Sequence, residues 1–345
     1  MRITKIWLLV ISMFLVQTSL SAAYTVKEGR LVNKDQIATM PVEDHYRLAC
    51  EAMAQEDWRE AAKQFKIVSY NFPNSSYGEE SFFYLGQCFY QLEDYDFANT
   101  SFSNYIACQS NPKFFQEAIE YKYNIAEQFR CGARRHVAGS KKLPKWQTGG
   151  TLAIQIYDEV VAAAPSHDLA ARSLYSKAYL LWGMKEFRDS VDCYQMLIKR
   201  FPKHELTPEA YLLINKVYCE LAKLEFGNPD ILAFAQINLR KFQNAFPREE
   251  RLPVAQQDVL RIQEVYANGL YQTGCFYERM DKPEASLIYY QKTIEEFPDT
   301  AVANCCRKRI EVLAPRYAPE LFSDETPGTD FDLEPFDFSD EDHTS

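Results

Sequence analysis

The 345-residue sequence is poor in glycine, with only 12, and has few runs in which apolar and polar residues alternate. Such alternation marks half-buried strands, so its scarcity favours an all-α fold with an ample core. The sequence has no glycine-rich loop for phosphate, and no Ser or Cys lies in a recognisable nucleophile context. Its five histidines are scattered along the chain. Because the sequence offers no candidate catalytic residues from which to build an active site, we expect a protein that is not an enzyme.

Basic charge is also scarce relative to acid. The formal net charge is −10, and residues 317–345 contain ten Asp or Glu but no Lys or Arg. The remaining residues carry 38 acids against the chain's 38 bases, so this part is neutral and lacks a field that would hold nucleic acid. The acid-rich, proline-containing stretch 314–345 predicts a disordered acidic tail.

The N-terminus resembles a secretory signal peptide. Met1 to Lys5 is basic, Ile6 to Val16 is apolar, and Ser19 to Ala23 supplies small residues for cleavage after Ala23. The apolar run is shorter than the ~20 residues of a spanning helix, so a retained anchor is the weaker alternative. The first cysteine is Cys50, which leaves no thiol near the signal region for a lipid. We expect an exported chain with an N-terminal linker over 24–41.

The nine cysteines raise the question of disulfides in an exported protein. Their number is odd, and several fall in helical stretches that would suit small buried groups, which favours buried thiols over a disulfide network: Cys50, Cys88, Cys193, Cys219 and Cys275. Cys131 and His136 lack a second pair at ligand spacing. We therefore expect no metal site, and nothing in the sequence indicates another cofactor.

A recurring pair of residues divides the sequence into repeats. The pair is Phe-Pro at four places, with weaker echoes at two more: Phe72-Pro73, Phe201-Pro202, Phe246-Pro247, Phe297-Pro298, Asn111-Pro112 and Ala164-Pro165. Small residues precede five of these prolines by twelve positions: Ala61, Ala153, Ser190, Ala235 and Ser286. One helical turn later stand residues predicted to be in the core: Phe65, Tyr157, Tyr194, Leu239 and Tyr290.

The first helix of each repeat has its own signature, a small residue followed three positions later by an aromatic one. Examples are Gly86 with Phe89, Ala126 with Phe129, and Gly274 with Tyr277. This pattern resembles the tetratricopeptide repeat. The resemblance predicts a superhelical α-solenoid of about six helix-turn-helix units over 42–313, with a loop inserted at about 132–150.

Stacked repeats of this kind use their first helices to line a binding surface. The positions expected to point inward form an aromatic groove for a client peptide: Tyr46, Met53, Phe83, Tyr90, Tyr123, Tyr175, Tyr179 and Trp182. Arg130 and Tyr271 occupy similar positions. The alternative is that several of these side chains fill gaps between repeats.

Basic residues concentrate in and beside the inserted loop: Arg130, Arg134, Arg135, His136, Lys141, Lys142 and Lys145, with Trp146 nearby. The loop could contact an acidic partner, lipid head groups or the chain's own acidic tail. The alternative is a solvated loop without a partner.

Two stretches resemble one particular family of repeat proteins. Phe72 to Tyr77, and Leu270 to Thr300 with its Gly274, Tyr290 and Phe297-Pro298, are similar to the BamD-like (YfiO/ComL-type) outer-membrane assembly factors. The resemblance implies a periplasmic scaffold at the inner face of the outer membrane. Its partners would be a BamA-like insertase and unfolded barrel proteins, with membrane association through those partners.

The family's N-terminal repeats imply a client pocket at Tyr46, Met53, Phe83 and Tyr90. The chain departs from the family by lacking the lipid-attachment cysteine, by its longer array and by its acidic tail. A second interpretation is a periplasmic repeat protein that coordinates envelope constriction or peptidoglycan synthesis with the Tol-Pal system. A third is a secretion-system chaperone, against which the predicted signal peptide argues.

Overall fold

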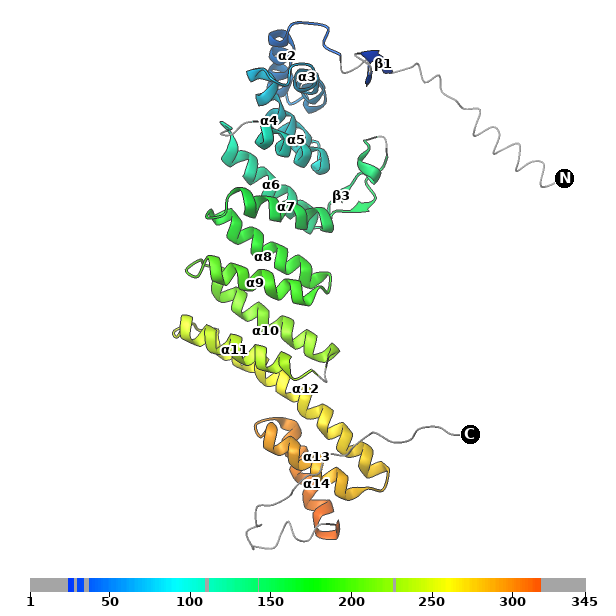
Figure 1. Cartoon of the computed structure of the whole chain (residues 1–345), viewed down its shortest axis with the longest axis vertical. Coiled ribbons are helices and arrows are strands. Elements are labelled where there is room, and N and C mark those ends of the chain that lie inside the picture. Colours follow the sequence, from blue (N-terminus) through cyan, green and yellow to red (C-terminus); the bar gives the residue numbers. More distant parts are fainter. Residues whose placement is uncertain are drawn as a thin grey trace, which may run out of the picture. The chain divides into compact units, whose positions relative to one another are not determined.

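The computed structural model describes residues 24–27, 30–33, 37–108, 112–141, 143–225 and 228–317. The predicted signal peptide, Lys142 and most of the predicted acidic tail lie outside these ranges. Within them the chain forms thirteen α-helices in sequential helix-turn-helix units, which confirms the all-α prediction (Figure 1). The chain divides into two compact units, residues 1–217 and 218–345.

The N-terminal unit consists of helix pairs, and each helix from α2 to α8 packs against the one that follows it along the chain (Figure 1). Its helices are α2 (Val42–Ala54), α3 (Trp58–Asn71), α4 (Ser76–Gln91), α5 (Tyr95–Cys108), α6 (Phe115–Arg130), α7 (Gly150–Ala163), α8 (Asp168–Gly183), α9 (Phe187–Arg200) and most of α10 (Thr207–Leu224). In the segment predicted as a linker, β1 (Tyr24–Lys27) pairs antiparallel with β2 (Arg30–Asn33). The segment is thus not wholly irregular.

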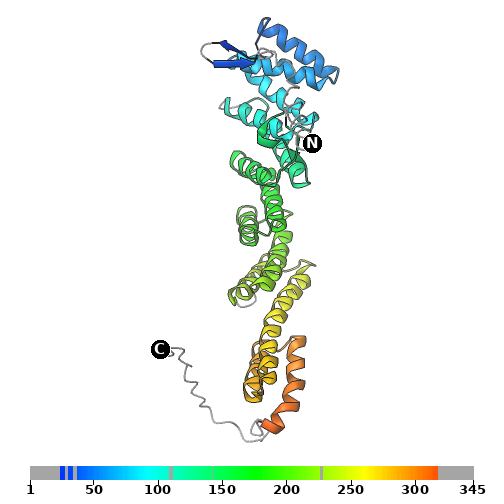
Figure 2. The same ribbon diagram turned by 90° about the vertical axis from the view of Figure 1, so that its right-hand side faces the viewer.

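The C-terminal unit contains α11 (Asp230–Ala245), α12 (Leu252–Arg279), α13 (Pro283–Glu296) and α14 (Ala301–Tyr317). The 28-residue α12 is one continuous helix that packs against α11, α13 and α14 (Figure 2). It is the first helix of the last helix pair, and α13 is the second. Helix α14 includes residues 314–317, which the sequence had assigned to the tail.

The recurring proline acts through the residue before it. Five second helices end at such a residue, and all five have nearly the same backbone, with φ between −134° and −127° and ψ between 49° and 66°: Phe72, Ala164, Phe201, Phe246 and Phe297. A following proline disfavours the helical region for the residue before it. The Phe-Pro pair is therefore a helix stop, repeated with the same geometry.

The turn after Phe72 also starts the next helix. The Ser75 hydroxyl donates to the Phe72 carbonyl oxygen at 2.8 Å and accepts from the Gly78 amide at 3.0 Å. A Cβ at position 78 would lie 1.9 Å from that carbonyl oxygen, so only glycine fits. Thr300 likewise donates to the Phe297 carbonyl oxygen at 2.8 Å. A capping hydroxyl thus accounts for the Ser and Thr that follow these two marks.

Small residues lie where the paired helices cross. All five crossing residues predicted from the sequence are fully buried: Ala61, Ala153, Ser190, Ala235 and Ser286. On the facing helix, a Cβ at Gly86 would lie 2.7 Å from the Phe102 ring. Leu239 is the exception among the predicted core residues, because it is only partly buried. The buried stripe of α11 runs through Asn238 instead, one residue earlier.

Candidate protein-binding surfaces

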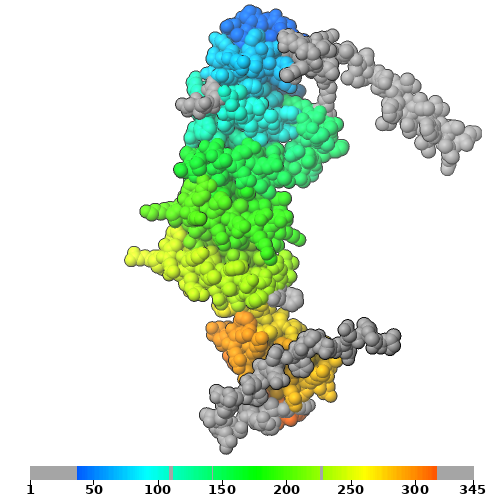
Figure 3. Space-filling model, in the orientation of Figure 1, coloured from blue at the N-terminus to red at the C-terminus, as the bar shows by residue number. Residues whose placement is uncertain are grey.

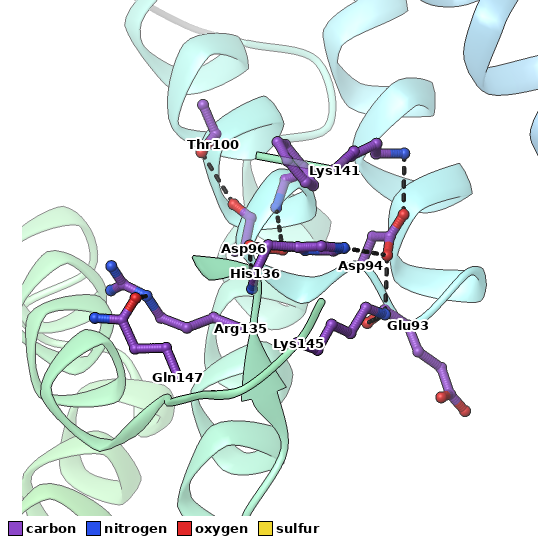
Figure 4. Close-up of polar contacts among 10 residues, drawn as sticks. Glu93, Asp94, Asp96, Thr100, Arg135, His136, Lys141, Lys145 and Gln147 are labelled. Atoms are coloured by element: carbon purple, nitrogen blue, oxygen red, sulfur yellow. Dashed lines mark hydrogen bonds and ion pairs between the residues drawn. The ribbon is translucent and has the colours of Figure 1, made fainter. Parts of the chain in front are cut away.

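The inserted loop begins after α6 and ends at α7. Its stem is a short antiparallel ladder between β3 (Arg134–Arg135) and β4 (Gln147–Thr148), and a single 3₁₀ turn spans Val137–Gly139. The loop lies against the start of α5, which belongs to the preceding repeat (Figure 4). In Figure 3 its green surface adjoins the cyan surface of that repeat.

Two aspartates hold the loop in place (Figure 4). The His136 amide donates to an Asp96 carboxylate oxygen at 3.0 Å, and His136 Nδ1 lies 3.0 Å from the same oxygen. The Lys141 and Lys145 ammonium groups each lie 2.9 Å from Asp94. Burial alone would raise the pKa of Asp94, but hydrogen bonds from the two lysines lower it below its ordinary value. Three of the predicted basic residues are therefore paired within the chain.

The other predicted basic residues have different surroundings. Arg135 donates to the Gln147 side-chain oxygen at 3.1 Å, and Arg134 is exposed. Arg130 bonds Glu127 at 2.6 Å, and this bond raises the pKa of Arg130. Trp146 is 71% exposed. The basic segment is thus partly a docked structural element and partly open surface.

The predicted inward positions of α6 and α8 form one surface, which we call the first-helix face: Tyr123, Arg130, Tyr179 and Trp182. The Arg130 guanidinium lies 6.0 Å from the Tyr179 ring centroid, and the Tyr179 and Trp182 rings are 6.0 Å apart. Burial is the main cause that raises the pKa of Tyr123. Tyr179 is 48% exposed, so this face offers an aromatic side chain beside the Arg130–Glu127 ion pair.

Tyr175, also predicted to point inward, packs edge-on against Tyr194 of α9 at 5.8 Å. Tyr271, in the C-terminal unit, packs on Tyr290 at 5.6 Å. Both rings are partly buried. They fill space between helices, which was the alternative considered for such positions.

The positions predicted for the first two repeats include no side chain as exposed as Tyr179. Tyr46 donates to a Glu80 carboxylate oxygen at 3.0 Å, and burial raises its pKa. Tyr90 packs edge-on against Tyr121 at 5.2 Å. Met53 packs against the core. These three side chains link neighbouring helices and are only partly accessible.

Phe83 does not lie in a groove. It is 3% exposed and stacks on Phe114 with ring centroids 4.6 Å apart. Helical residues are separated by about 100° around the axis, so the next residue, Tyr84, faces another way. Tyr77 and Tyr84 are partly accessible beside Tyr46, at 4.9 and 6.4 Å between rings. Sequence reasoning missed both, although their spacing of seven places them on one helical face.

All nine cysteines fall within the described ranges and are free thiols. Cys88, Cys193 and Cys306 are buried, whereas Cys108, Cys131 and Cys305 are exposed. Burial raises the pKa of the Cys88 thiol to about 12. Among the described residues, no group of three or more His, Cys, Asp or Glu could hold a metal ion. None of the helices described here is long and apolar enough to cross a membrane.

Two segments match a protein-family model for the tetratricopeptide repeat, residues 172–204 and 269–300. Both segments are tetratricopeptide repeats. The first contains α9 and most of α8, and with them Tyr175, Tyr179 and Trp182. Such repeats generally serve as non-catalytic scaffolds for protein contacts. The chain therefore contains two repeats of a kind that generally mediates protein contacts, and its helices are arranged in helix-turn-helix units like those of such repeats.

Solved structures with similar helical arrays include MamA, with 15% identity over 61% of this chain and 92% of that chain and a TM-score of 0.34. A tetratricopeptide repeat protein from Parabacteroides merdae has 10% identity over 79% and 98%, with a TM-score of 0.33. PilW, a widely conserved type IV pilus biogenesis factor, has 15% identity over 78% and 99%, with a TM-score of 0.28. No curated protein matches the sequence.

Proposed function

We propose that the chain is an exported scaffold that binds an extended or helical segment of a partner protein on the first-helix face. The observation that carries the proposal is the half-exposed Tyr179 ring, whose centroid lies 6.0 Å from the Arg130 guanidinium and 6.0 Å from the Trp182 ring. Aromatic and Arg side chains dominate binding energy in protein interfaces. The face lies partly in a segment that matches the repeat model.

The finer proposal concerns the biological setting. The predicted signal peptide and the resemblance of Phe72 to Tyr77 and Leu270 to Thr300 support a periplasmic role in the assembly of outer-membrane barrels. The partners would be a BamA-like insertase and unfolded barrel proteins. Because barrel proteins often end in an aromatic residue, an aromatic client surface is chemically suited to them. The chain would associate with the membrane through these partners.

The test is an affinity pull-down of the tagged full chain from envelope extract, followed by mass spectrometry. Recovery of a BamA-like protein together with barrel proteins is the expected result. Recovery of Pal or cell-wall synthesis enzymes without them would contradict the assembly role and favour the Tol-Pal interpretation. The wild-type pull-down is compared with Tyr179→Ala, which should reduce client recovery about tenfold if Tyr179 contributes like an interface hot spot.

The matched control is Met196→Ala, on α9 of the same repeat. Met196 is 46% exposed, nearly the same as Tyr179 at 48%, but it lies on the second helix. Recovery with Met196→Ala should equal wild type. An equal loss with both variants would place the client surface elsewhere.

A further inference from the structure

A basic hollow lies where the inserted loop covers the preceding repeats. It encloses about 620 Å³, and its cationic lining comes from α3 and from the loop: Arg59, Lys63, Lys66, Lys141 and Lys145. Asp94 is the acidic residue that lines it. Lys63 also has a nearby carboxylate, Glu60 at 3.3 Å. The basic hollow therefore carries an excess of positive charge among the residues described.

A second hollow, of about 700 Å³, adjoins the first and is lined by a group of aromatic side chains together with polar ones. They include Tyr70, Phe82 and Phe97, from α3, α4 and α5. Lys66, Phe89 and Lys141 line both hollows, so the two lie side by side. We call the second one the aromatic hollow.

The junction of the two hollows combines cations with rings. The Lys141 ammonium lies 3.9 Å from the Phe89 ring centroid and 5.3 Å from that of Phe97. Burial lowers the pKa of Lys66, and the charge of Lys141 lowers it further. A carboxylate placed between these two ammonium groups would relieve their repulsion. The site thus suits a ligand with acidic groups beside aromatic ones.

We propose that these hollows bind the chain's own acidic segment 318–345, with carboxylates in the basic hollow and phenyl rings in the aromatic hollow. The segment contains ten Asp or Glu and no Lys or Arg. Its aromatic residues alternate with acids, as in Asp330-Phe331-Asp332 and Phe336-Asp337-Phe338. In an extended peptide, alternate side chains point to opposite sides, which matches a site with one basic and one aromatic region.

The test is zero-length carbodiimide crosslinking of the purified full chain, which joins lysine amines to carboxylates in contact. The sequence after Arg316 contains no Lys or Arg, so trypsin releases it as one peptide that mass spectrometry can follow. We expect this peptide on Lys66 and Lys141 about tenfold more often than on the exposed Lys199 of α9. Because Debye screening shortens to about 3 Å at 1 M salt, the excess should vanish there.

Two variants separate charge from ring contacts. Lys66→Gln removes a cation that is not paired with Asp94, and it should reduce crosslinks between the acidic segment and Lys141 severalfold. Lys199→Gln should leave those crosslinks unchanged. Replacing Phe331, Phe336 and Phe338 with Ser keeps every acid and should also reduce them. Unchanged yield with the Ser variant would overturn the assignment of the rings to the aromatic hollow.

Equal crosslinking of Lys66, Lys141 and Lys199 in the wild type would overturn the whole proposal. Mixing isotopically heavy and light chains shows whether the segment comes from the same molecule or a second copy, and either source supports it. The experiment contains no client or insertase. Its failure is therefore independent of the proposed function.

Discussion

The first-helix face and the loop-covered side of the same N-terminal unit arise in different ways. The first-helix face includes positions that recur between repeats, such as Arg130 on α6 and Trp182 on α8, which each follow a buried alanine, Ala126 or Ala178, by four residues. The loop-covered side depends on one insertion, which places His136 against Asp96 across 40 positions of sequence. The first is a property of the repeat, whereas the second depends on the inserted loop.

The difference separates general from specific roles. A repeated face can bind a long partner segment along several units, because each unit adds an equivalent helix. The hollows beneath the inserted loop form a single local site with its own charge. Variants that act on the repeat geometry should therefore affect folding, while variants in the loop should act locally.

The largest effect is expected where the repeat requires glycine. A Cβ at Gly274 of α12 would lie 2.5 Å from the Tyr290 ring, which is fully buried and bonded to Glu278 at 3.0 Å. Gly274→Ala should destabilise the protein by about 1–3 kcal/mol in urea unfolding, because the ring cannot move away freely.

Gly269→Ala, in the same helix, is the matched control, since a Cβ there meets nothing within 4 Å. Alanine has the higher helix propensity, so this variant should gain up to about 1 kcal/mol. If both variants change stability by the same amount and sign, close helix crossing is not what selects Gly274.

A comparable effect is expected when the buried Lys122, which ties α6 to its neighbours, loses one of its partners. Its ammonium is 2% exposed and donates to Asn99 at 2.8 Å and to Ser103 at 2.6 Å, and lies 2.5 Å from Glu159. Glu159→Ala should cost about 1–3 kcal/mol, because it leaves a buried charge with fewer partners. Lys122→Met, which removes the charge, should cost less.

The pH dependence of this pair has a definite sign. Burial lowers the pKa of Lys122, despite the opposing effect of Glu159. The unfolded chain therefore binds this proton more tightly than the folded chain does. The buried charge of Lys122 destabilises the folded state, and this cost is relieved as pH rises from the folded pKa towards the ordinary value of 10.5. Removing Glu159 lowers the folded pKa of Lys122 further, so in urea unfolding the deficit of Glu159→Ala should shrink as pH rises from the variant's folded pKa to that of the wild type, where only the variant loses the proton. A deficit that grows with pH would contradict a buried, protonated Lys122.

The smallest effect is expected at the loop. Asp94→Asn removes the carboxylate shared by Lys141 and Lys145, so amides of 133–148 should exchange hydrogen faster, with a global stability loss below about 1 kcal/mol. Asp158→Asn, whose carboxylate bonds Lys177 at 2.6 Å, should leave loop exchange unchanged. Equal exchange in wild type and Asp94→Asn would show that these ion pairs do not hold the loop.

In the wild type, docking of the inserted loop should also weaken at low pH. The pKa of Asp94 is lowered from its ordinary 3.8, so its contribution is complete above that value and is lost as pH falls through the lower folded value. Hydrogen exchange at pH 5 and below pH 3.8 checks this. Docking that weakens already between pH 7 and pH 5 would point to another group.

The sequence predicted the repeat core well because the same physical requirement recurs. Ala61, Ser190 and Ser286 could be placed by counting from the following proline, and all are fully buried. The prediction failed at Phe83. Counting residues places Phe83 along its helix, but adjacent residues point about 100° apart around the helix axis, and the count did not show which of them faces the neighbouring rings. The loop contacts could not be predicted, since nothing near Lys141 in sequence indicates Asp94 as its partner.

The central claim, that partners bind on the first-helix face, can be tested by site-specific photocrosslinking. A photoreactive phenylalanine is placed at Tyr179 or at Met196, two positions of the same repeat with 48% and 46% exposure. The account predicts that photocrosslinking in whole cells yields protein adducts at position 179 and few adducts at position 196. Equal capture at both positions, or capture from 196 alone, would contradict it.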